Sequence, residues 1–373
     1  MNKRVFNFLA LILALVLCLA MVVPAMAIEA SDADTGKTSV KVYKNLIIDA
    51  NTNVPDVTFE YTLASRPNNP DASTATVTYY AGITTGLTTS YNVRFASSET
   101  PTPGSPGNTG DAEHKYLKKE FEIEFKNVNF TEPGIYRYIL TEQTQSGYSA
   151  EVYTYYIDVF VEYVRDTGSD GVFDLTIGNF VIYKDGNSAP EKVNDVVYNN
   201  RYPTNTLDIS KTVAGNQGSR NEFFPFSIAF TAGSVPAGDY TISGQNGNND
   251  AEHPTYKKIT VAADGTVTPG TIYLKHDQKI QIIGLPSTAG YTIKETNSGD
   301  YTVSTVKTEG STVTNGTSAT VTGTLGDATT VAYTNTRTGT IPTGVLLTIA
   351  PFAGLMIVGL VGVVIVLKKK RNR

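Results

Sequence analysis

Residues 40–46 read VKVYKNL, and residues 207–213 read LDISKTV. In both stretches apolar side chains recur at every second position, which is the period of a β-strand with one face against a core. The alternation puts Lys44 and Lys211 in phase with the apolar residues, on the side that faces the core. Each stretch therefore predicts a strand and raises the question of why a lysine should be buried.

The sequence as a whole has the composition of an all-β protein. It contains 22 Tyr and no Trp, and only 17% of its residues are charged. Short alternating segments, such as residues 59–63 (FEYTL), 153–163 (YTYYIDVFVEY) and 239–244 (DYTISG), are separated by Gly, Asn, Asp and Pro clusters. This rhythm favours β-sandwiches over βαβ units. The net charge of −5 and the lack of a basic stripe argue against nucleic acid as a partner.

The chain repeats itself and predicts two homologous domains. The order VYKNL, PGIYRYILTEQT, VVYNN in the first half returns as DISKTV, AGYTIKETN, VAYTN in the second. We expect immunoglobulin-like β-sandwiches at residues 40–202 and 203–338, joined at NRYPTNTL (200–207) with almost no linker. Residues 28–39 then form an N-terminal extension. Two tandem sandwiches joined in this way predict an elongated rod.

Both ends of the chain carry membrane-directed patterns. Residues 1–27 have a basic start, an apolar middle and an Ala-Met-Ala finish, which predicts a secretory signal peptide cleaved after Ala27. Residues 345–367 form an apolar stretch long enough to span a membrane, and the basic tail 368–373 follows it. Without the signal the chain has no cysteine, so an exported protein must obtain its stability without disulfides.

Each predicted domain places three polar residues on the apolar side of its strands. Glu142 is in phase with Tyr138 and Leu140, and Asn200 is in phase with Val196 and Tyr198. The second domain repeats the set in the same order. The six residues are Lys44, Glu142 and Asn200, then Lys211, Glu295 and Asn335.

Two interpretations of these residues stay open from the phase alone. One is a buried structural ion pair beside an amide, because unpaired burial of either charge would cost several kcal/mol. The other is an intramolecular isopeptide bond, in which a neutral lysine amine attacks the asparagine amide and ammonia leaves. Burial would keep the amine neutral and the glutamate protonated, so that the acid polarises the amide and shuttles protons. Tyr136, Tyr138 and Tyr291 are candidates for excluding water.

The segments YKNL, YILTEQT and YNN, with LDISKTV, YTIKET and YTN, resemble the isopeptide-containing backbone pilins of Gram-positive bacteria, of the streptococcal T-antigen type. The resemblance covers essentially the whole chain and implies two CnaB-like sandwiches. It implies bonds from Lys44 to Asn200, assisted by Glu142, and from Lys211 to Asn335, assisted by Glu295. The neighbouring Asn199 and Asn45 are weaker alternatives, because their phase points them to the other face.

The resemblance also implies a sorting signal and an acceptor amine. Residues 339–344 contain Ile341, Pro342, Thr343 and Gly344 directly before the apolar stretch, similar to the Val-Pro-Thr-Gly version of the sortase motif. A sortase would cut between Thr343 and Gly344. The acceptor would be a lysine shortly before the last strand of the first domain, for which Lys192 is expected and Lys184 is the alternative.

The function implied is that of a structural shaft subunit in a covalently polymerised, cell-wall-anchored pilus that begins as a membrane-inserted precursor. Its partners would be a pilin-polymerising sortase, identical subunits, ancillary tip and base pilins, peptidoglycan and host-cell receptors. The alternative is a wall-anchored monomeric adhesin or stalk. Neither is an enzyme, since the only chemistry is a self-directed single turnover, and no cofactor is expected. The repeated turns at 111–114 and 250–253 (DAEH) hold carboxylates and a histidine but have no second cluster at metal-ligand spacing, so no metal site is expected.

Overall fold

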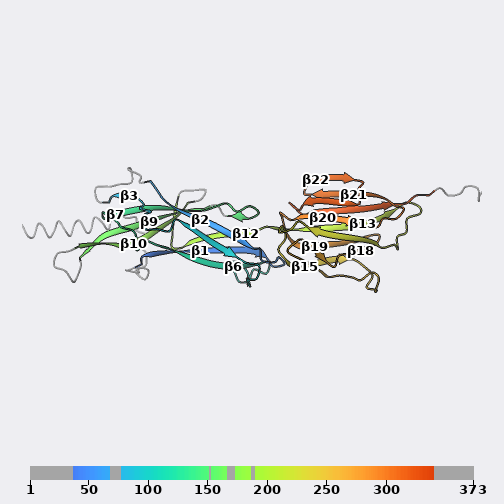
Figure 1. The fold of residues 1–373 in the computed structure, drawn as a ribbon, viewed down its shortest axis with the longest axis horizontal. Coiled ribbons are helices and arrows are strands. Elements are labelled where there is room, and N and C mark those ends of the chain that lie inside the picture. The colour runs from blue at the N-terminus through green and yellow to red at the C-terminus, as the bar shows by residue number, and fades with distance from the viewer. Residues whose placement is uncertain (1–36, 68–76, 151–152, 166–172, 186–189, 340–373) are drawn as a thin grey trace, which may run out of the picture. The chain divides into compact units, whose positions relative to one another are not determined.

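The computed structural model describes residues 37–67, 77–150, 153–165, 173–185 and 190–339 (Figure 1). Every regular element in these ranges is a β-strand, which confirms the all-β prediction. Within the same ranges no helix is long and apolar enough to cross a membrane. The predicted signal peptide, sorting motif, membrane span and basic tail lie outside the described residues.

Contacts divide the described chain into two compact units. The main boundary between them falls between Tyr202 and Pro203. The segment Asp49–Pro55, which the sequence places in the first domain, groups with the second unit instead.

The first unit consists of two sheets. Its strands are β1 (Ser39–Asp49), β2 (Val57–Ser65), β3 (Tyr79–Ala81), β4 (Ser90–Phe95), β5 (Thr102–Pro103), β6 (His114–Glu124), β7 (Gly134–Glu142), β8 (Ser149–Ala150), β9 (Thr154–Arg165), β10 (Phe173–Asp185), β11 (Glu191–Val193) and β12 (Val196–Tyr202). One sheet has the order β5-β6-β1-β12-β8, and the other has the order β11-β10-β9-β7-β2-β4 with β3 beside β7.

The second unit also consists of two sheets. Its strands are β13 (Thr204–Ala214), β14 (Phe224–Phe230), β15 (Gly238–Gln245), β16 (Lys258–Val261), β17 (Val267–Thr268), β18 (Ile272–Leu274), β19 (Gln278–Pro286), β20 (Gly290–Glu295), β21 (Thr302–Glu309), β22 (Thr312–Gly316), β23 (Thr320–Thr324) and β24 (Thr329–Thr336). The larger sheet has the order β17-β16-β15-β19-β13-β24-β21-β22, and the smaller has the order β18-β14-β20-β23.

Each unit pairs its first and last strands in parallel, with the same register. In the first unit β1 lies beside β12, with Lys44 opposite Tyr198 and Leu46 opposite Asn200. In the second unit β13 lies beside β24, with Lys211 opposite Tyr333 and Val213 opposite Asn335. The lysine of the first strand and the asparagine of the last are therefore two pairs apart on neighbouring strands.

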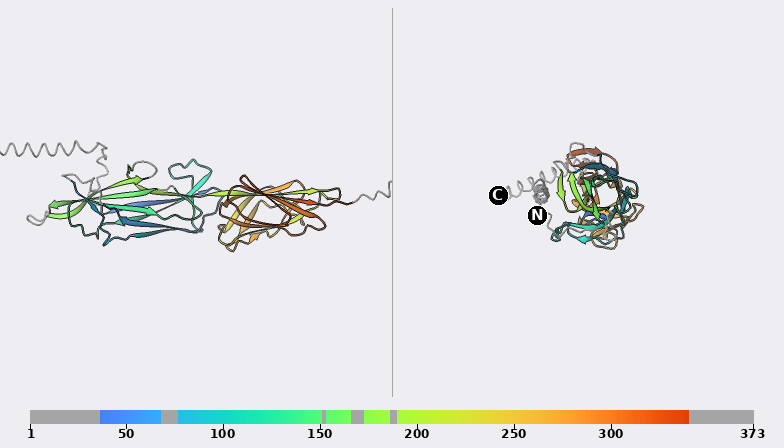
Figure 2. Two further views of the ribbon diagram at one scale, coloured as in Figure 1. Left: turned by 90° about the horizontal axis from the view of Figure 1, so that it is seen from above. Right: turned by 90° about the vertical axis from the view of Figure 1, so that its left-hand side faces the viewer.

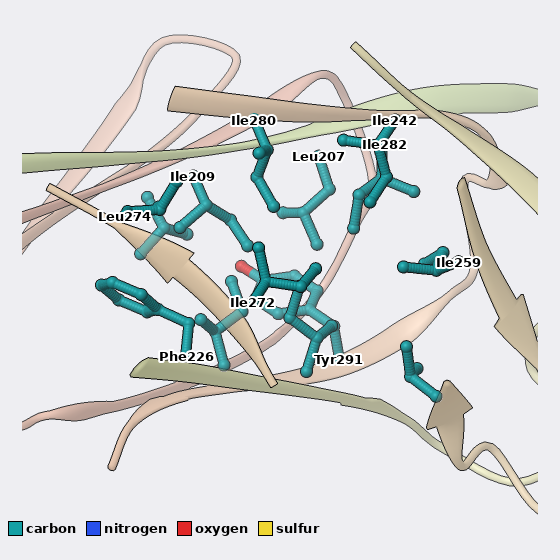
Figure 3. Close-up of a cluster of buried hydrophobic side chains, with 14 of the residues drawn as sticks. Leu207, Ile209, Phe226, Ile242, Ile259, Ile272, Leu274, Ile280, Ile282 and Tyr291 are labelled. Carbon is teal, nitrogen blue, oxygen red and sulfur yellow. The ribbon is translucent and has the colours of Figure 1, made fainter. Parts of the chain in front are cut away.

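Alternation along these strands builds the core between the sheets of each unit. Figure 2 shows the strands from two further directions. In the second unit the side chains of Leu207 and Ile209 on β13 meet Phe226 on β14 and Ile280 and Ile282 on β19, all fully buried (Figure 3). Aliphatic and aromatic side chains on a pleated surface pack well in such a layer. The two lysines lie on the strand faces that supply these cores.

Candidate functional site: two buried lysine, glutamate and asparagine clusters

The first cluster brings Lys44, Glu142 and Asn200 into direct contact. Nζ of Lys44 donates to Oδ1 of Asn200 at 2.5 Å and to Oε2 of Glu142 at 2.8 Å. Nδ2 of Asn200 donates to Oε1 of Glu142 at 2.6 Å. Lys44 is fully buried, and the Glu142 side chain is 8% exposed. The three side chains come from β1, β7 and β12, and so from both sheets of the unit.

The second cluster repeats this arrangement with Lys211, Glu295 and Asn335. Nζ of Lys211 donates to both carboxylate oxygens of Glu295, at 3.1 and 3.0 Å. Nδ2 of Asn335 donates to Oε1 of Glu295. Both charged side chains are 0% exposed. Oδ1 of Asn335 is buried and has no hydrogen-bond partner among the described residues.

Aromatic rings enclose each lysine amine at matching positions. Nζ of Lys44 lies 3.8 Å from the centroid of the Phe59 ring, and Nζ of Lys211 lies 4.0 Å from that of Phe224. A second ring lies farther off, at 6.0 Å for Tyr61 and 5.9 Å for Phe226. These rings replace water around the amine, although their faces also attract its charged form.

Burial dominates the electrostatics of both lysines. It lowers the pKa of Lys44 to about 8, against the opposing attraction of Glu142. It lowers the pKa of Lys211 to about 8 in the same way, against the attraction of Glu295. A lysine with such a pKa exists in part as the free amine near neutral pH, and the free amine is the nucleophilic form.

The structure also places the residues that the sequence assigned to water exclusion. The hydroxyl of Tyr136 donates to the carbonyl of Glu132, and that of Tyr138 donates to the carbonyl of Ile83. The Tyr291 hydroxyl is buried without a hydrogen-bond partner among the described residues. The rings nearest the lysines are instead those described above.

The sequence carried a signal for those missed rings. Phe59 and Tyr61 are in phase in FEYTL, and Phe224 and Phe226 are in phase in FPFSI (224–228). Each pair occupies the strand that follows the lysine strand, β2 or β14. Both repeats have two in-phase aromatic residues on this strand, and this repetition would have identified the rings as neighbours of the lysines.

The alternative asparagines do not join the first cluster. Nδ2 of Asn45 donates to Oδ1 of Asn199 at 2.9 Å, and the two residues are directly opposite in the β1–β12 register. Because side chains alternate along a strand, this pair lies on the sheet face opposite to Lys44 and Asn200. Neither amide is bonded to the Lys44 amine.

Lys192 and Lys184 have different surroundings. Lys192, on β11, lines a pocket of about 610 Å³ together with Lys41, Glu122, Phe180 and other residues of β1, β10 and β11. Lys184, on β10, holds its amine 3.4 Å from the centroid of the Tyr153 ring. Both residues are half-buried, and Lys192 differs from Lys184 in that it lines a pocket.

The two DAEH turns are built by local hydrogen bonds. Nδ1 of His114 lies 2.8 Å from Oδ2 of Asp111, and the backbone N–H of His253 donates to Asp250 at 2.6 Å. In the described part of the chain no group of three or more His, Cys, Asp and Glu side chains is arranged to hold a metal ion.

Comparisons with known proteins identify relatives of the chain. Residues 205–337 match a family model described as a domain of unknown function (DUF7601). A pilin of Streptococcus pyogenes serotype M1 is 25% identical over 261 residues, covering 68% of this chain and 72% of the relative.

Solved structures share the fold. The crystal structure of the major pilin from Streptococcus pyogenes matches with a TM-score of 0.62 at 20% identity, over 82% of this chain and all of that chain. The T-13 major pilin of the same species matches with a TM-score of 0.57 at 22% identity, over 81% of this chain and 98% of that chain. The chain is thus a homologue of a streptococcal pilin in sequence and has the fold of the major pilins of that species.

Proposed function

We propose that the chain is the shaft subunit of a covalently polymerised pilus on a Gram-positive cell surface, with an isopeptide bond within each unit. The observation that carries the proposal is the repeated contact of lysine, glutamate and asparagine inside both units of a pilin homologue. A plain ion pair would account for the lysine and the glutamate. It does not account for an asparagine amide against the carboxylate in both units.

The geometry of the first cluster fits amide exchange with Glu142 as the proton carrier. Transfer of one proton within the ion pair makes both Lys44 and Glu142 neutral. The Lys44 amine then attacks Cγ of Asn200, and the new C–N bond forms as the bond to Nδ2 breaks. Glu142 takes a proton from Nζ and delivers one to Nδ2, which leaves as ammonia. The carboxyl group can do both because its oxygens lie 2.8 Å from Nζ and 2.6 Å from Nδ2.

The second cluster supports the same reaction. Glu295 contacts both Lys211 and Asn335, and no part of its side chain is exposed to solvent. Oδ1 of Asn335 has no hydrogen-bond partner among the described residues, so attack on the amide carbon breaks no hydrogen bond to this oxygen. Both reactions occur once per molecule on the chain's own residues, which is why we regard the protein as a structural subunit and not as an enzyme.

Assembly of the shaft requires a sortase. The enzyme would cut the membrane-inserted precursor between Thr343 and Gly344 and pass the Thr343 acyl group to an amine of the next subunit. Lys192 is the proposed acceptor because it lines a pocket at the edge of its sheet. Ancillary pilins would complete the shaft, and transfer to peptidoglycan would anchor it.

The function is tested by expressing the chain with a cognate sortase in a Gram-positive host and separating wall extracts on a denaturing gel. The wild type should give a ladder of covalent polymers, and Lys192→Ala should abolish it. Lys184→Ala is the matched control and should leave the ladder intact. A ladder that persists in Lys192→Ala and disappears in Lys184→Ala moves the acceptor to Lys184. A wild type without any ladder is instead a wall-anchored monomer.

A further inference from the structure

The two clusters differ at one position, which is occupied by Tyr61 in the first unit and Phe226 in the second. Tyr61 is directly opposite Glu142 in the β2–β7 register, and Phe226 is directly opposite Glu295 in the β14–β20 register. Each ring packs on the tyrosine of the last strand, Tyr198 or Tyr333, with centroids 5.1 and 5.0 Å apart. The side chains are therefore equivalent except for one hydroxyl group.

That hydroxyl group contacts the proton carrier. Oη of Tyr61 donates to Oε2 of Glu142 at 3.0 Å. Tyr61 is 1% exposed. Burial, and secondarily the charge of Glu142, raises the pKa of Tyr61 far above its usual range. The phenol therefore keeps its proton under ordinary conditions and remains a hydrogen-bond donor.

The two carboxyl oxygens of Glu142 share the Lys44 amine but differ in their second donor. Nζ of Lys44 lies 2.9 Å from Oε1 and 2.8 Å from Oε2. Oε2 also accepts from the Tyr61 phenol, whereas Oε1 also accepts from the amide of Asn200. A carboxylate oxygen has two lone pairs, so at Oε2 the phenol occupies one and the amine faces the other. Attack on Cγ turns Nδ2 of Asn200 from a hydrogen-bond donor into an acceptor, whereas the phenol goes on donating to Oε2. In the neutral acid this favours the proton on Oε1, beside the nitrogen that must leave.

We infer that Tyr61 is a positioning residue for the Lys44–Asn200 bond, holding Glu142 by Oε2 so that Oε1 carries the proton given to the departing ammonia. This inference rests on the proposed isopeptide chemistry. Atoms balance because Oε1 gives one proton to Nδ2 while Oε2 receives one from Nζ, and Glu142 ends neutral.

In the second unit Glu295 is held in place without a hydrogen bond from a phenol among the described residues. The Glu295 side chain is 0% exposed, whereas that of Glu142 is 8% exposed. A carboxyl group with some access to solvent can be bonded by water, and Tyr61 fills one of the positions that water would take. Full enclosure makes such a donor unnecessary at Glu295, where a phenylalanine suffices.

The rate of bond formation tests this role. Unreacted chain, dissolved from inclusion bodies in denaturant and checked by mass, is refolded by dilution, and ammonia loss at each junction is followed by mass spectrometry of proteolytic fragments. Tyr61→Phe should slow closure of the Lys44–Asn200 junction about tenfold, the equivalent of one hydrogen bond of roughly 1.4 kcal/mol. Closure of the Lys211–Asn335 junction in the same molecules should be unchanged.

Tyr198→Phe is the matched control. It removes a buried hydroxyl that donates to the carbonyl of Leu140 and does not touch Glu142. Its first junction should close at the wild-type rate. Equal first-junction rates in wild type and Tyr61→Phe, or equal slowing in Tyr61→Phe and Tyr198→Phe, would overturn the inference. A wild type that loses no ammonia at either junction overturns the proposed chemistry itself, which is a different result.

A spectroscopic measurement separates positioning from simple packing. In a Lys44→Met background the junction cannot react, and the protonated Glu142 carboxyl group gives an infrared C=O band at low pH. Adding Tyr61→Phe should move this band to higher frequency, because the carbonyl oxygen Oε2 loses its donor. Adding Tyr198→Phe should leave the band in place. An unmoved band in the Tyr61 variant contradicts the inference even if that variant closes its junction slowly.

Discussion

Lys44 and Lys211 have amines whose neighbours are a carboxylate, an asparagine amide and a phenylalanine ring. Burial outweighs the attraction of the carboxylate and lowers the pKa of each lysine to about 8. Burial disfavours the charged amine and so raises the population of the neutral amine, which is the form that reacts. Forming the amide removes both charges from the core.

The lowered lysine pKa predicts the pH dependence of an unreacted fold. An Asn200→Ala, Asn335→Ala chain cannot form either bond. Between pH 8 and about 10.4, the pKa of an unfolded lysine, the unfolded chain binds more protons than the native one. Its free energy of unfolding should therefore rise with pH from 8 to 10. The destabilisation that comes from burying the two charged lysines should be fully present below pH 8. Urea midpoints across this range measure the trend.

The control for this trend also carries Lys44→Met and Lys211→Met. In this control the free energy of unfolding should not rise between pH 8 and 10. Buried tyrosines titrate in both chains, so their effect cancels in the comparison. If the urea midpoint of the parent chain decreases relative to that of this control as the pH is raised from 8 to 10, the lysines do not have the lowered pKa values described above.

At the scale of elements, the strand period accounts for what the sequence could and could not reveal. Lys44, Glu142 and Asn200 could be placed inside because each lies in a strand whose alternation is clear. Tyr61 also has a clear phase, but its contact with Glu142 depends on the pairing of β2 with β7, two strands far apart in sequence. The second unit has one sheet of eight strands and one of four, and Asp49–Pro55 belongs to the second unit by its contacts. Both features depend on contacts between residues far apart in the sequence, which the strand period does not reveal.

Alternation within β12 makes the choice of asparagine testable by intact mass. The wild-type ectodomain, residues 28–339, should lack two ammonia molecules, and Asn200→Ala should lack only one. Asn199 should not substitute, because it is bonded to Asn45 on the other face of the sheet. Glu142→Ala and Glu295→Ala should each restore one ammonia, with the exposed Glu120→Ala as a control that restores none. A deficit of two in Asn200→Ala would mean that a neighbouring amide reacts.

At the scale of the whole molecule, the first and last strands of each unit lie side by side in parallel. Each proposed lysine–asparagine bond would therefore close a loop that contains nearly all residues of its unit. Lys44 and Asn200 are 156 positions apart, so in the chain-entropy model the proposed bond between them would stabilise the unit by about 5 kcal/mol. The proposed cross-links would take the place of disulfides, since the sequence has no cysteine beyond residue 18. Their mechanical effect depends on where tension enters the subunit.

In a polymer joined from Thr343 to Lys192, tension follows covalent bonds along one path. It enters at Lys192, continues through β12 into β13 and reaches Lys211. A bond from Lys211 to Asn335 then carries it directly to β24, bypassing more than a hundred residues. The Lys44–Asn200 bond lies beside this path, because residues 192–202 are already continuous along the backbone. Only the second bond should limit extension of the loaded shaft.

Single-molecule pulling between residue 192 and the C-terminal end of the ectodomain tests this division of roles. Lys192→Cys and a cysteine added after residue 339 supply the only thiols. Glu295→Gln should add an unfolding step of roughly 400 Å, the contour length of the released loop. Glu142→Gln should extend like the parent chain, although its first unit should unfold at a lower temperature. A long step in Glu142→Gln, or none in Glu295→Gln, would show that tension takes another route through the subunit.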